Sequence, residues 1–242
     1  MKKESRILFN NKSILLIFCL LISNFLTIRL FKNIFINDIK ILGTKYITKE
    51  DLLKNSSLVF PTRLIFVKTK FIEKELKENL SLKNISIDRQ LFPFGLQVRV
   101  QTRKPFAYGE KIENGIKVEG YVDEDGFFIR KDFAENPTNN IYQVRIIGWN
   151  KKISAVVSKI LKSYKNQSND LQAIHIDSKD FIILKEKKFN KVLLGFNHSN
   201  IDFQLNIISE IKSQLSKKKF VKEIESLDLI DPNYPKIKVF KP

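Results

Sequence analysis

Few residues in this chain have the types and spacing that catalysis or metal binding requires. Among its 242 residues are two histidines, His175 and His198, and a single cysteine, Cys19. Neither histidine has an acidic partner at the spacing of a metal-binding helix, and there is no phosphate-binding loop or serine elbow. Cys19 can form no disulfide within the chain. The sequence therefore predicts a protein that is not an enzyme and holds no cofactor and no metal.

An acidic run, Asp123-Glu124-Asp125-Gly126, has side chains that could coordinate a cation. A calcium loop needs several further oxygen ligands at alternate positions, and these are missing here. Asp125-Gly126 is also a strong signal for a tight turn between two strands. The run therefore predicts a hairpin in residues 120–128.

Basic residues accompany a second hairpin, in residues 82–107. Apolar and polar residues alternate on both sides of Phe92-Pro93-Phe94-Gly95, which is typical of two half-buried strands around a turn. Arg89 precedes the turn, and Arg103-Lys104-Pro105 closes the second strand. The two arginines could form a basic docking face, but both occupy polar positions of the alternation, which favours solvated strand residues. Pro105 predicts the end of the strand, because proline donates no ladder hydrogen bond.

The formal net charge is +17, which would suit nucleic acid, acidic lipid or an acidic polymer as a partner. The lysines are spread diffusely in a chain rich in Asn, Ile and Phe, so AT-rich codon usage explains most of the charge. Hydrophobic residues make up 43% of the chain, enough for a packed core.

Residues 13–31 form a nearly continuous apolar run of about 28 Å as a helix, close to the thickness of a bilayer core of roughly 30 Å. Basic residues ahead of it predict a cytoplasmic tail over residues 1–12. A cleaved signal peptide is the alternative, but no small-residue cleavage site follows the run, which favours an uncleaved anchor. The part beyond Lys32, with 37 basic and 25 acidic residues and a charge of about +12, would then lie outside the cytoplasm and meet no nucleic acid.

The pattern beyond the anchor predicts an α+β protein. Residues 34–42 read as a strand with a slip at Asp38, ended by Gly43. Thr48 and Asp51 have the spacing of a helix N-cap. A second helix covers residues 69–80, with Phe71, Ile72, Leu76 and Leu80 on one apolar face. The hairpin of residues 82–107 completes the order strand, helix, helix, strand, strand.

The second half predicts a mixed sheet with flanking helices. Amphipathic helices cover residues 153–164 and 200–215. Strands are expected in residues 171–176, 180–184, 191–194, 221–229 and 236–240.

The first half resembles the POTRA domain, a β-α-α-β-β module found near membranes. In the FtsQ/DivIB family of bacterial cell-division proteins, the last POTRA strand ends in Glu-Arg-x-Pro-x-Ala. Arg103, Pro105 and Ala107 match this motif, Thr102 stands in place of the glutamate, and Gly43 follows the first strand. Val122-Asp123 with Gly126 is similar to the family's Val-Asp-x-x-Gly hairpin, and Leu227-Asp228-Leu229 to its penultimate strand, although Ile230 replaces an arginine there.

The resemblance implies a transmembrane anchor (13–31), a POTRA domain (34–107) and a β-domain (108–242). It implies a non-enzymatic single-pass scaffold of the divisome, in the inner (plasma) membrane at the division septum, with a cytoplasmic N-terminus and an extracytoplasmic C-terminal domain. Expected partners are FtsB- and FtsL-like proteins, other divisome membrane proteins and the lipid bilayer, with no nucleic acid and no small-molecule substrate. The alternative is an outer-membrane assembly or secretion factor, since POTRA modules also occur there.

The resemblance also places partner binding on the last strand. In the family, FtsB adds a strand beside the segment that corresponds to Ile237, Lys238, Val239 and Phe240. Terminal strands often lie at a sheet edge, where their backbone groups are unpaired. The alternative is that these residues complete the core of the β-domain, and docking is the preferred interpretation.

Overall fold

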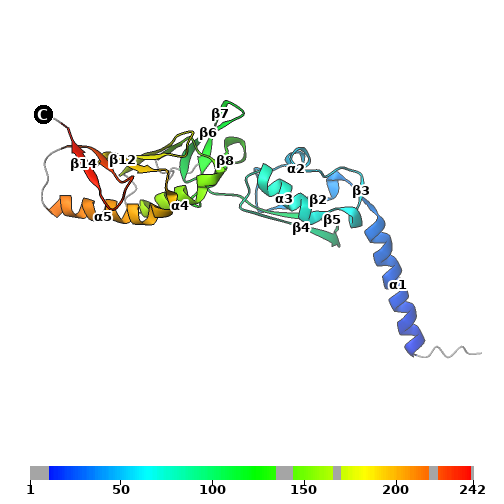
Figure 1. Cartoon of the computed structure of the whole chain (residues 1–242). Coiled ribbons are helices and arrows are strands. Elements are labelled where there is room, and N and C mark those ends of the chain that lie inside the picture. The colour runs from blue at the N-terminus through cyan, green and yellow to red at the C-terminus, as the bar shows by residue number, and fades with distance from the viewer. Residues whose placement is uncertain (1–10, 135–143, 166–169, 218–222, 241–242) are drawn as a thin grey trace, which may run out of the picture. The chain divides into compact units, whose positions relative to one another are not determined.

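The computed structural model describes residues 11–134, 144–165, 170–217 and 223–240, so most of the predicted tail lies outside the described residues. The chain has the predicted α+β architecture and divides into two compact units, Met1–Gln101 and Thr102–Pro242 (Figure 1). A long N-terminal helix and a small sheet belong to the first unit. A large mixed sheet belongs to the second.

Helix α1 (Asn11–Phe31) carries the apolar run. Its window Ile14–Phe31 has a mean hydropathy of 2.3, and none of the residues in this window is fully buried. Helix α1 is therefore long and apolar enough to cross a membrane, as predicted for residues 13–31.

The rest of the first unit has the predicted order of strands and helices. A three-stranded sheet has the order β2-β5-β4, with β2 parallel to β5 and β4 antiparallel to it. A separate pair, β1 and β3, is antiparallel. The elements are β1 (Asn33–Ile34), β2 (Ile39–Leu42), α2 (Lys49–Lys54), β3 (Thr62–Arg63), α3 (Thr69–Asn79), β4 (Asn84–Leu91) and β5 (Phe94–Gln101).

The predicted first strand is broken into two. A 3-10 turn (Ile36–Asp38) separates β1 from β2, and the Asp38 carboxylate accepts a hydrogen bond from the Phe35 backbone N–H at 2.8 Å. The slip at Asp38 in the sequence pattern is therefore a real turn, which lets β1 leave the main sheet and pair with β3.

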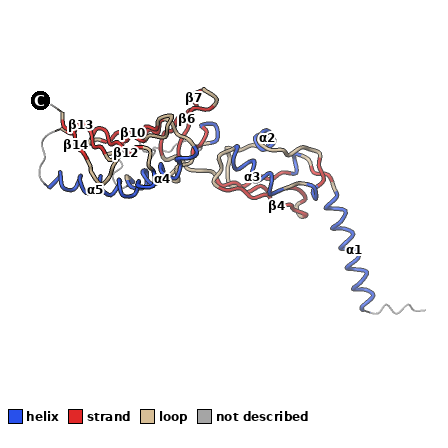
Figure 2. The backbone as a smooth tube through the Cα atoms, viewed as in Figure 1, coloured by secondary structure: helices blue, strands red, loops and turns tan. Residues whose placement is uncertain are grey.

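The local sequence explains both helices of this unit. Thr48 and Asp51 form the predicted capping box at the start of α2. Along α3, Ile72 and Leu76 are buried, while Phe71, predicted on the same face, is 54% exposed. The helices cover the face of the sheet (Figure 2) on which Ile85, Ile87, Leu96, Val98 and Val100 are buried.

The second unit is built on a nine-stranded sheet of order β14-β13-β12-β11-β10-β9-β6-β7-β8. Its neighbours are antiparallel except β6/β9, β9/β10 and β12/β13, which are parallel. Helices α4 (Ser154–Ser163) and α5 (Ile201–Lys217) lie on one face of the sheet (Figure 2), where apolar side chains of the helices and strands form one core. The strands are β6 (Ala107–Glu113), β7 (Ile116–Val122), β8 (Phe128–Arg130), β9 (Arg145–Ile147), β10 (Leu171–Ile176), β11 (Ile182–Glu186), β12 (Asn190–Gly195), β13 (Ile224–Asp228) and β14 (Lys236–Val239).

The predicted elements of this unit are present, with shifted boundaries. The strand expected in residues 180–184 begins two residues later, because the Asp177 carboxylate accepts hydrogen bonds from the N–H groups of Lys179 and Phe181 and forms a turn. The strand expected in residues 221–229 is β13, and residues 221–222 lie outside the described segments.

A buried charge pair fixes α5 on the sheet. The Lys212 ammonium contacts the carboxylate of Glu186 on β11 and lies 3.0 Å from that of Asp170. It also lies 4.7 Å from the centre of the Tyr164 ring. Burial raises the pKa of the Tyr164 hydroxyl, and the charges of Glu186 and Asp170 act in the same direction.

The apolar face of α3 gives the first test of the fold. Leu76→Asp places an unpaired charge at a position that is only 1% exposed, so the free energy of unfolding of the first unit should fall by several kcal/mol. Phe71→Asp, on the same helix but exposed, should change it by less than about 1 kcal/mol. Limited proteolysis of both variants checks this, and equal protease resistance of residues 33–101 in the two would contradict the assigned face.

Candidate functional site

Strand β14 lies at the edge of the nine-stranded sheet, as predicted for the last strand. It pairs with β13 on one side, and no described strand pairs with the other side. Ile237 is 44% exposed and Phe240 is 48% exposed. Val239 is half-buried against the core, and the Lys238 ammonium pairs with Glu225 at 2.8 Å. Of the four predicted residues, only Val239 contributes to the core, so the strand is accessible.

The hydrogen bonds of β14 show which backbone groups are available. The Phe240 N–H donates to the Glu223 carbonyl at 3.2 Å, toward β13. Successive residues of a strand direct their backbone N–H and C=O groups to opposite sides. The backbone groups of Lys238 therefore also point toward β13, while those of Ile237 and Val239 point outward, away from the sheet. The open edge therefore presents two N–H and two C=O groups at the spacing that an added strand requires.

The opposite edge of the sheet is less suited to strand addition. Strand β8 has three residues, and the Arg130 guanidinium lies 3.5 Å from the Glu113 carboxylate. Short, charged edge strands are poor templates for pairing. The β14 edge is therefore better suited to pairing with an added strand than the β8 edge.

Gly43, the first of the motif residues, follows β2 with a φ of +97°. A Cβ at this position would lie 2.1 Å from the Val100 carbonyl oxygen of β5. Glycine is required here because it allows both the backbone conformation and the close approach to the neighbouring strand. Its role is structural.

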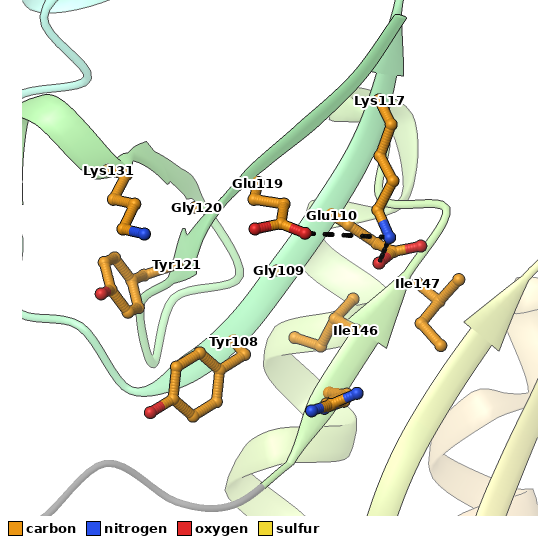
Figure 3. A pocket seen from close by; sticks show the side chains of 11 residues that line it. Tyr108, Gly109, Glu110, Lys117, Glu119, Gly120, Tyr121, Lys131, Ile146 and Ile147 are labelled. Atoms are coloured by element: carbon orange, nitrogen blue, oxygen red, sulfur yellow. Dashed lines mark ion pairs between the residues drawn. The ribbon is translucent and has the colours of Figure 1, made fainter.

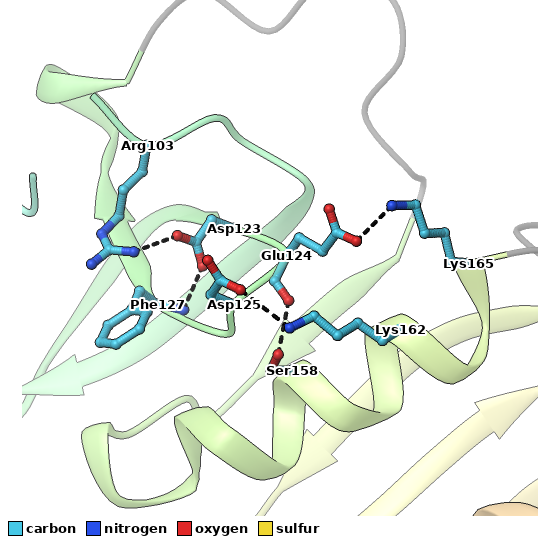
Figure 4. A network of polar contacts seen from close by, with 8 residues as sticks. All are labelled: Arg103, Asp123, Glu124, Asp125, Phe127, Ser158, Lys162 and Lys165. Carbon is cyan, nitrogen blue, oxygen red and sulfur yellow. Dashed lines mark hydrogen bonds and ion pairs between the residues drawn. The ribbon is translucent and has the colours of Figure 1, made fainter. Parts of the chain in front are cut away.

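Arg103 forms a buried ion pair with Asp123, shown in Figure 4. The guanidinium Nη1 lies 2.6 Å from the Asp123 Oδ2, and the two side chains are only 9% and 7% exposed. The guanidinium also lies 4.0 Å from the centre of the Phe127 ring, and the Asp123 Oδ1 accepts a hydrogen bond from the Phe127 N–H at 2.8 Å. The interpretation of Arg103 as a solvated residue is wrong, because its partner fixes it inside the second unit.

Arg89 has a different environment. It is exposed on β4, and its guanidinium donates to the Val67 carbonyl at 2.6 Å, just before α3. It therefore helps to hold the start of a helix against the sheet. Arg89 belongs to the first unit and Arg103 to the second.

Pro105 and Ala107 carry the chain into the second sheet. Ala107 begins β6 and is fully buried, and the Phe106 N–H donates to the Val122 carbonyl at 2.9 Å, directly before Asp123. The Arg-x-Pro-x-Ala segment and the Val-Asp-x-x-Gly turn are thus one structural unit. Both motifs are evident in the sequence, whereas the contact between them is visible only in the structure.

The turn of residues 123–126 is docked on α4. Gly126 has a φ of +79°, and a Cβ there would lie 1.9 Å from the Ser154 carbonyl oxygen. The Trp149 indole N–H donates to the Gly126 carbonyl at 2.8 Å. The remaining contacts in Figure 4 are Ser158 to the Glu124 carbonyl, Lys162 to Asp125 and Lys165 to Glu124. This acidic run is used in packing, which agrees with the predicted hairpin.

A shallow pocket lies over β6, β7 and β9 (Figure 3). Tyr108 and Tyr121 pack together there, with their ring centres 5.8 Å apart. The Lys117 ammonium lies 2.6 Å from the Glu110 carboxylate, and this hydrogen bond and charge raise the pKa of Lys117. None of the described residues lining the pocket is a histidine, cysteine or serine, so they provide no nucleophile activated by an imidazole base.

The two histidines lie apart from that pocket. The His198 Nε2 is 3.0 Å from the Asp180 carbonyl oxygen, at a turn before α5, and His175 is half-buried within β10. Within the described segments, no group of three or more His, Cys, Asp or Glu side chains is placed to hold a metal ion.

Comparison with known families identifies the domain that follows α1. Residues 35–103 match the family model described as the POTRA domain, FtsQ-type, and this segment includes β2, α2, α3, β4, β5 and Arg103. A search among curated proteins gave no match. The chain therefore contains an FtsQ-type POTRA domain, and the predicted resemblance to the FtsQ/DivIB family is confirmed over this segment.

The buried ion pair gives the second test. Arg103→Ala leaves the Asp123 carboxylate buried without its partner, so the free energy of unfolding of the second unit should fall by about 3–5 kcal/mol. Arg103→Met combined with Asp123→Asn removes both charges and should cost less than Arg103→Met alone. The control is Lys162→Ala, which breaks the exposed pair with Asp125 and should cost less than about 1 kcal/mol. Denaturant unfolding measures the free energy of unfolding of all four variants. Equal losses for Arg103→Ala and Lys162→Ala would show that the Arg103–Asp123 pair is solvated.

Proposed function

We propose that this chain, through its FtsQ-type POTRA domain, acts as a non-enzymatic single-pass scaffold of the bacterial divisome. The main support for this proposal is the match of residues 35–103 to the FtsQ-type POTRA family. It favours a division scaffold over an outer-membrane assembly factor. The second unit adds a long sheet with an accessible edge, a feature used for protein–protein binding.

Helix α1 would be the anchor of this scaffold in the plasma membrane. Lys2, Lys3, Arg6 and Lys12 precede the apolar window against Glu4 alone, so the positive-inside rule favours a cytoplasmic N-terminus. The POTRA domain and the second unit would then lie outside the cytoplasm, at the division septum. A scaffold in this place would connect division proteins through their extracytoplasmic parts.

The partner-binding site would be the open edge of β14. An extended segment of an FtsB-like protein, itself paired with an FtsL-like protein, would add a strand beside Ile237, Lys238, Val239 and Phe240. The two outward N–H groups, of Ile237 and Val239, support this proposal, as does the exposure of Ile237 and Phe240. Main-chain hydrogen bonds would give affinity, and alternate side chains would give specificity.

Proline substitution tests the docking site. Val239→Pro removes one outward donor but no hydrogen bond to β13, so the fold should be retained and binding of an extended FtsB-like peptide should fall at least about tenfold, the effect of ~1.4 kcal/mol. Val239→Thr keeps the donor and a β-branched side chain and should bind as the parent does. Circular dichroism and a titration with the peptide measure both properties. Undiminished binding by folded Val239→Pro would place the interface elsewhere, and global unfolding would favour the core interpretation.

The orientation has its own test. A reporter that is active only outside the cytoplasm, fused to the C-terminus of the full chain, should be active, and the N-terminal tag should remain on the protein. A second fusion of a reporter that is active only in the cytoplasm is the control. Activity of that second fusion alone would contradict the scaffold topology.

A further inference from the structure

The POTRA domain follows α1 almost without a linker. Helix α1 ends at Phe31 and β1 begins at Asn33, so Lys32 alone lies between them. Its carbonyl accepts a hydrogen bond from the Leu64 N–H at 3.2 Å, which ties it to the domain. One residue spans at most about 3.6 Å, so a membrane-spanning α1 brings this end of the domain to the bilayer surface.

The tip of the β4–β5 hairpin packs against the side of α1. The Phe92 ring stacks on the Phe25 ring with 5.7 Å between their centres. The Arg29 guanidinium lies 5.4 Å from the centre of Phe25, 5.2 Å from that of Phe92 and 5.8 Å from that of Phe94. Phe25 lies six residues before the end of the helix, about 9 Å along its axis. The hairpin tip therefore reaches a level inside the apolar window of α1.

Large apolar side chains are exposed at this end of the domain. Phe92 is 66% exposed despite its contact with Phe25, and Phe66 is 61% exposed beside Phe31, with their ring centres 6.4 Å apart. Arg63 and Lys68, on both sides of Phe66, are exposed as well. Exposed aromatic rings flanked by cations are typical of surfaces that enter the headgroup region of an anionic bilayer, to a depth of about 5–10 Å.

We propose that this end of the POTRA domain is a second membrane-contact site, in which Phe92 and Phe66 enter the outer surface of the bilayer beside α1. The partner is the lipid surface, and Arg29 is held at the interface by the three aromatic rings around it. The contact would fix the orientation of the POTRA domain on the membrane. The inference rests on the proposed membrane anchoring of α1.

The single cysteine allows a direct test with the full chain in vesicles of phosphatidylethanolamine and phosphatidylglycerol. An environment-sensitive fluorophore is attached at native Cys19 or, in a Cys19→Ser background, at Phe92→Cys, Phe66→Cys or Asn84→Cys. Asn84 is exposed at the other end of β4, about 23 Å along the strand from Leu91, and serves as the control. Lipids with a nitroxide near the headgroup or near the chain end quench each probe according to its depth.

Quenching by the shallow nitroxide should be several-fold stronger at Phe92 and Phe66 than at Asn84. The Phe66→Cys protein keeps Phe92, so it controls for loss of the contact through the substitution itself. The probe at Cys19, about 18 Å from the end of α1, should be quenched by the deep nitroxide. If it is, but shallow quenching at Phe92 and at Phe66 does not exceed that at Asn84, the proposed membrane contact is wrong while the anchor stands. Absence of deep quenching at Cys19 would instead contradict the anchor and with it the proposed topology.

Discussion

The buried ion pair between Arg103 and Asp123 is the contact on which the start of the second unit depends. Both charges are almost completely removed from water, so each is tolerated only because the other is present. Arg103 lies two residues beyond the last strand of the POTRA sheet, and Asp123 begins the turn after β7. The pair therefore fixes the chain at the point where it enters the new sheet.

Further contacts within the second unit depend on this ion pair. Asp123 shapes the turn through its bond to the Phe127 N–H, and the turn presents the Gly126 carbonyl to Trp149 and the Glu124 carbonyl to Ser158 on α4. Helix α4 in turn covers the sheet whose other end is β14. Two short motifs, separated by about twenty residues, thereby position the helix on one face of the sheet.

Much of the fold could be predicted because it follows from local patterns. The alternation around Phe92-Pro93 fixes β4 and β5, and the Thr48–Asp51 capping box fixes the start of α2. The pattern wrongly assigns Phe71 to the buried face of α3, because periodicity defines a helical face only approximately. Which residues at the border of that face are buried depends on tertiary packing. Arg103 was misread for a similar reason: alternation shows that a residue is polar, not whether a buried partner approaches it from elsewhere. The edge position of β14 was predicted, but the direction of its hydrogen bonds depends on register, which the sequence does not define.

An open strand edge requires protection against unspecific pairing, and β14 shows how this can coexist with binding. Lys236 and Lys238 lie on one face of the strand, and Lys238 is paired with Glu225 at an irregularity in the register of β13. Lysines and such irregularities disfavour pairing with arbitrary strands. Ile237 and Val239 lie on the other face and direct their N–H groups outward. Under the proposed function, a strand that alternates apolar side chains toward Ile237 with acidic ones toward the lysines would fit this edge, whereas a uniformly apolar or basic strand would not.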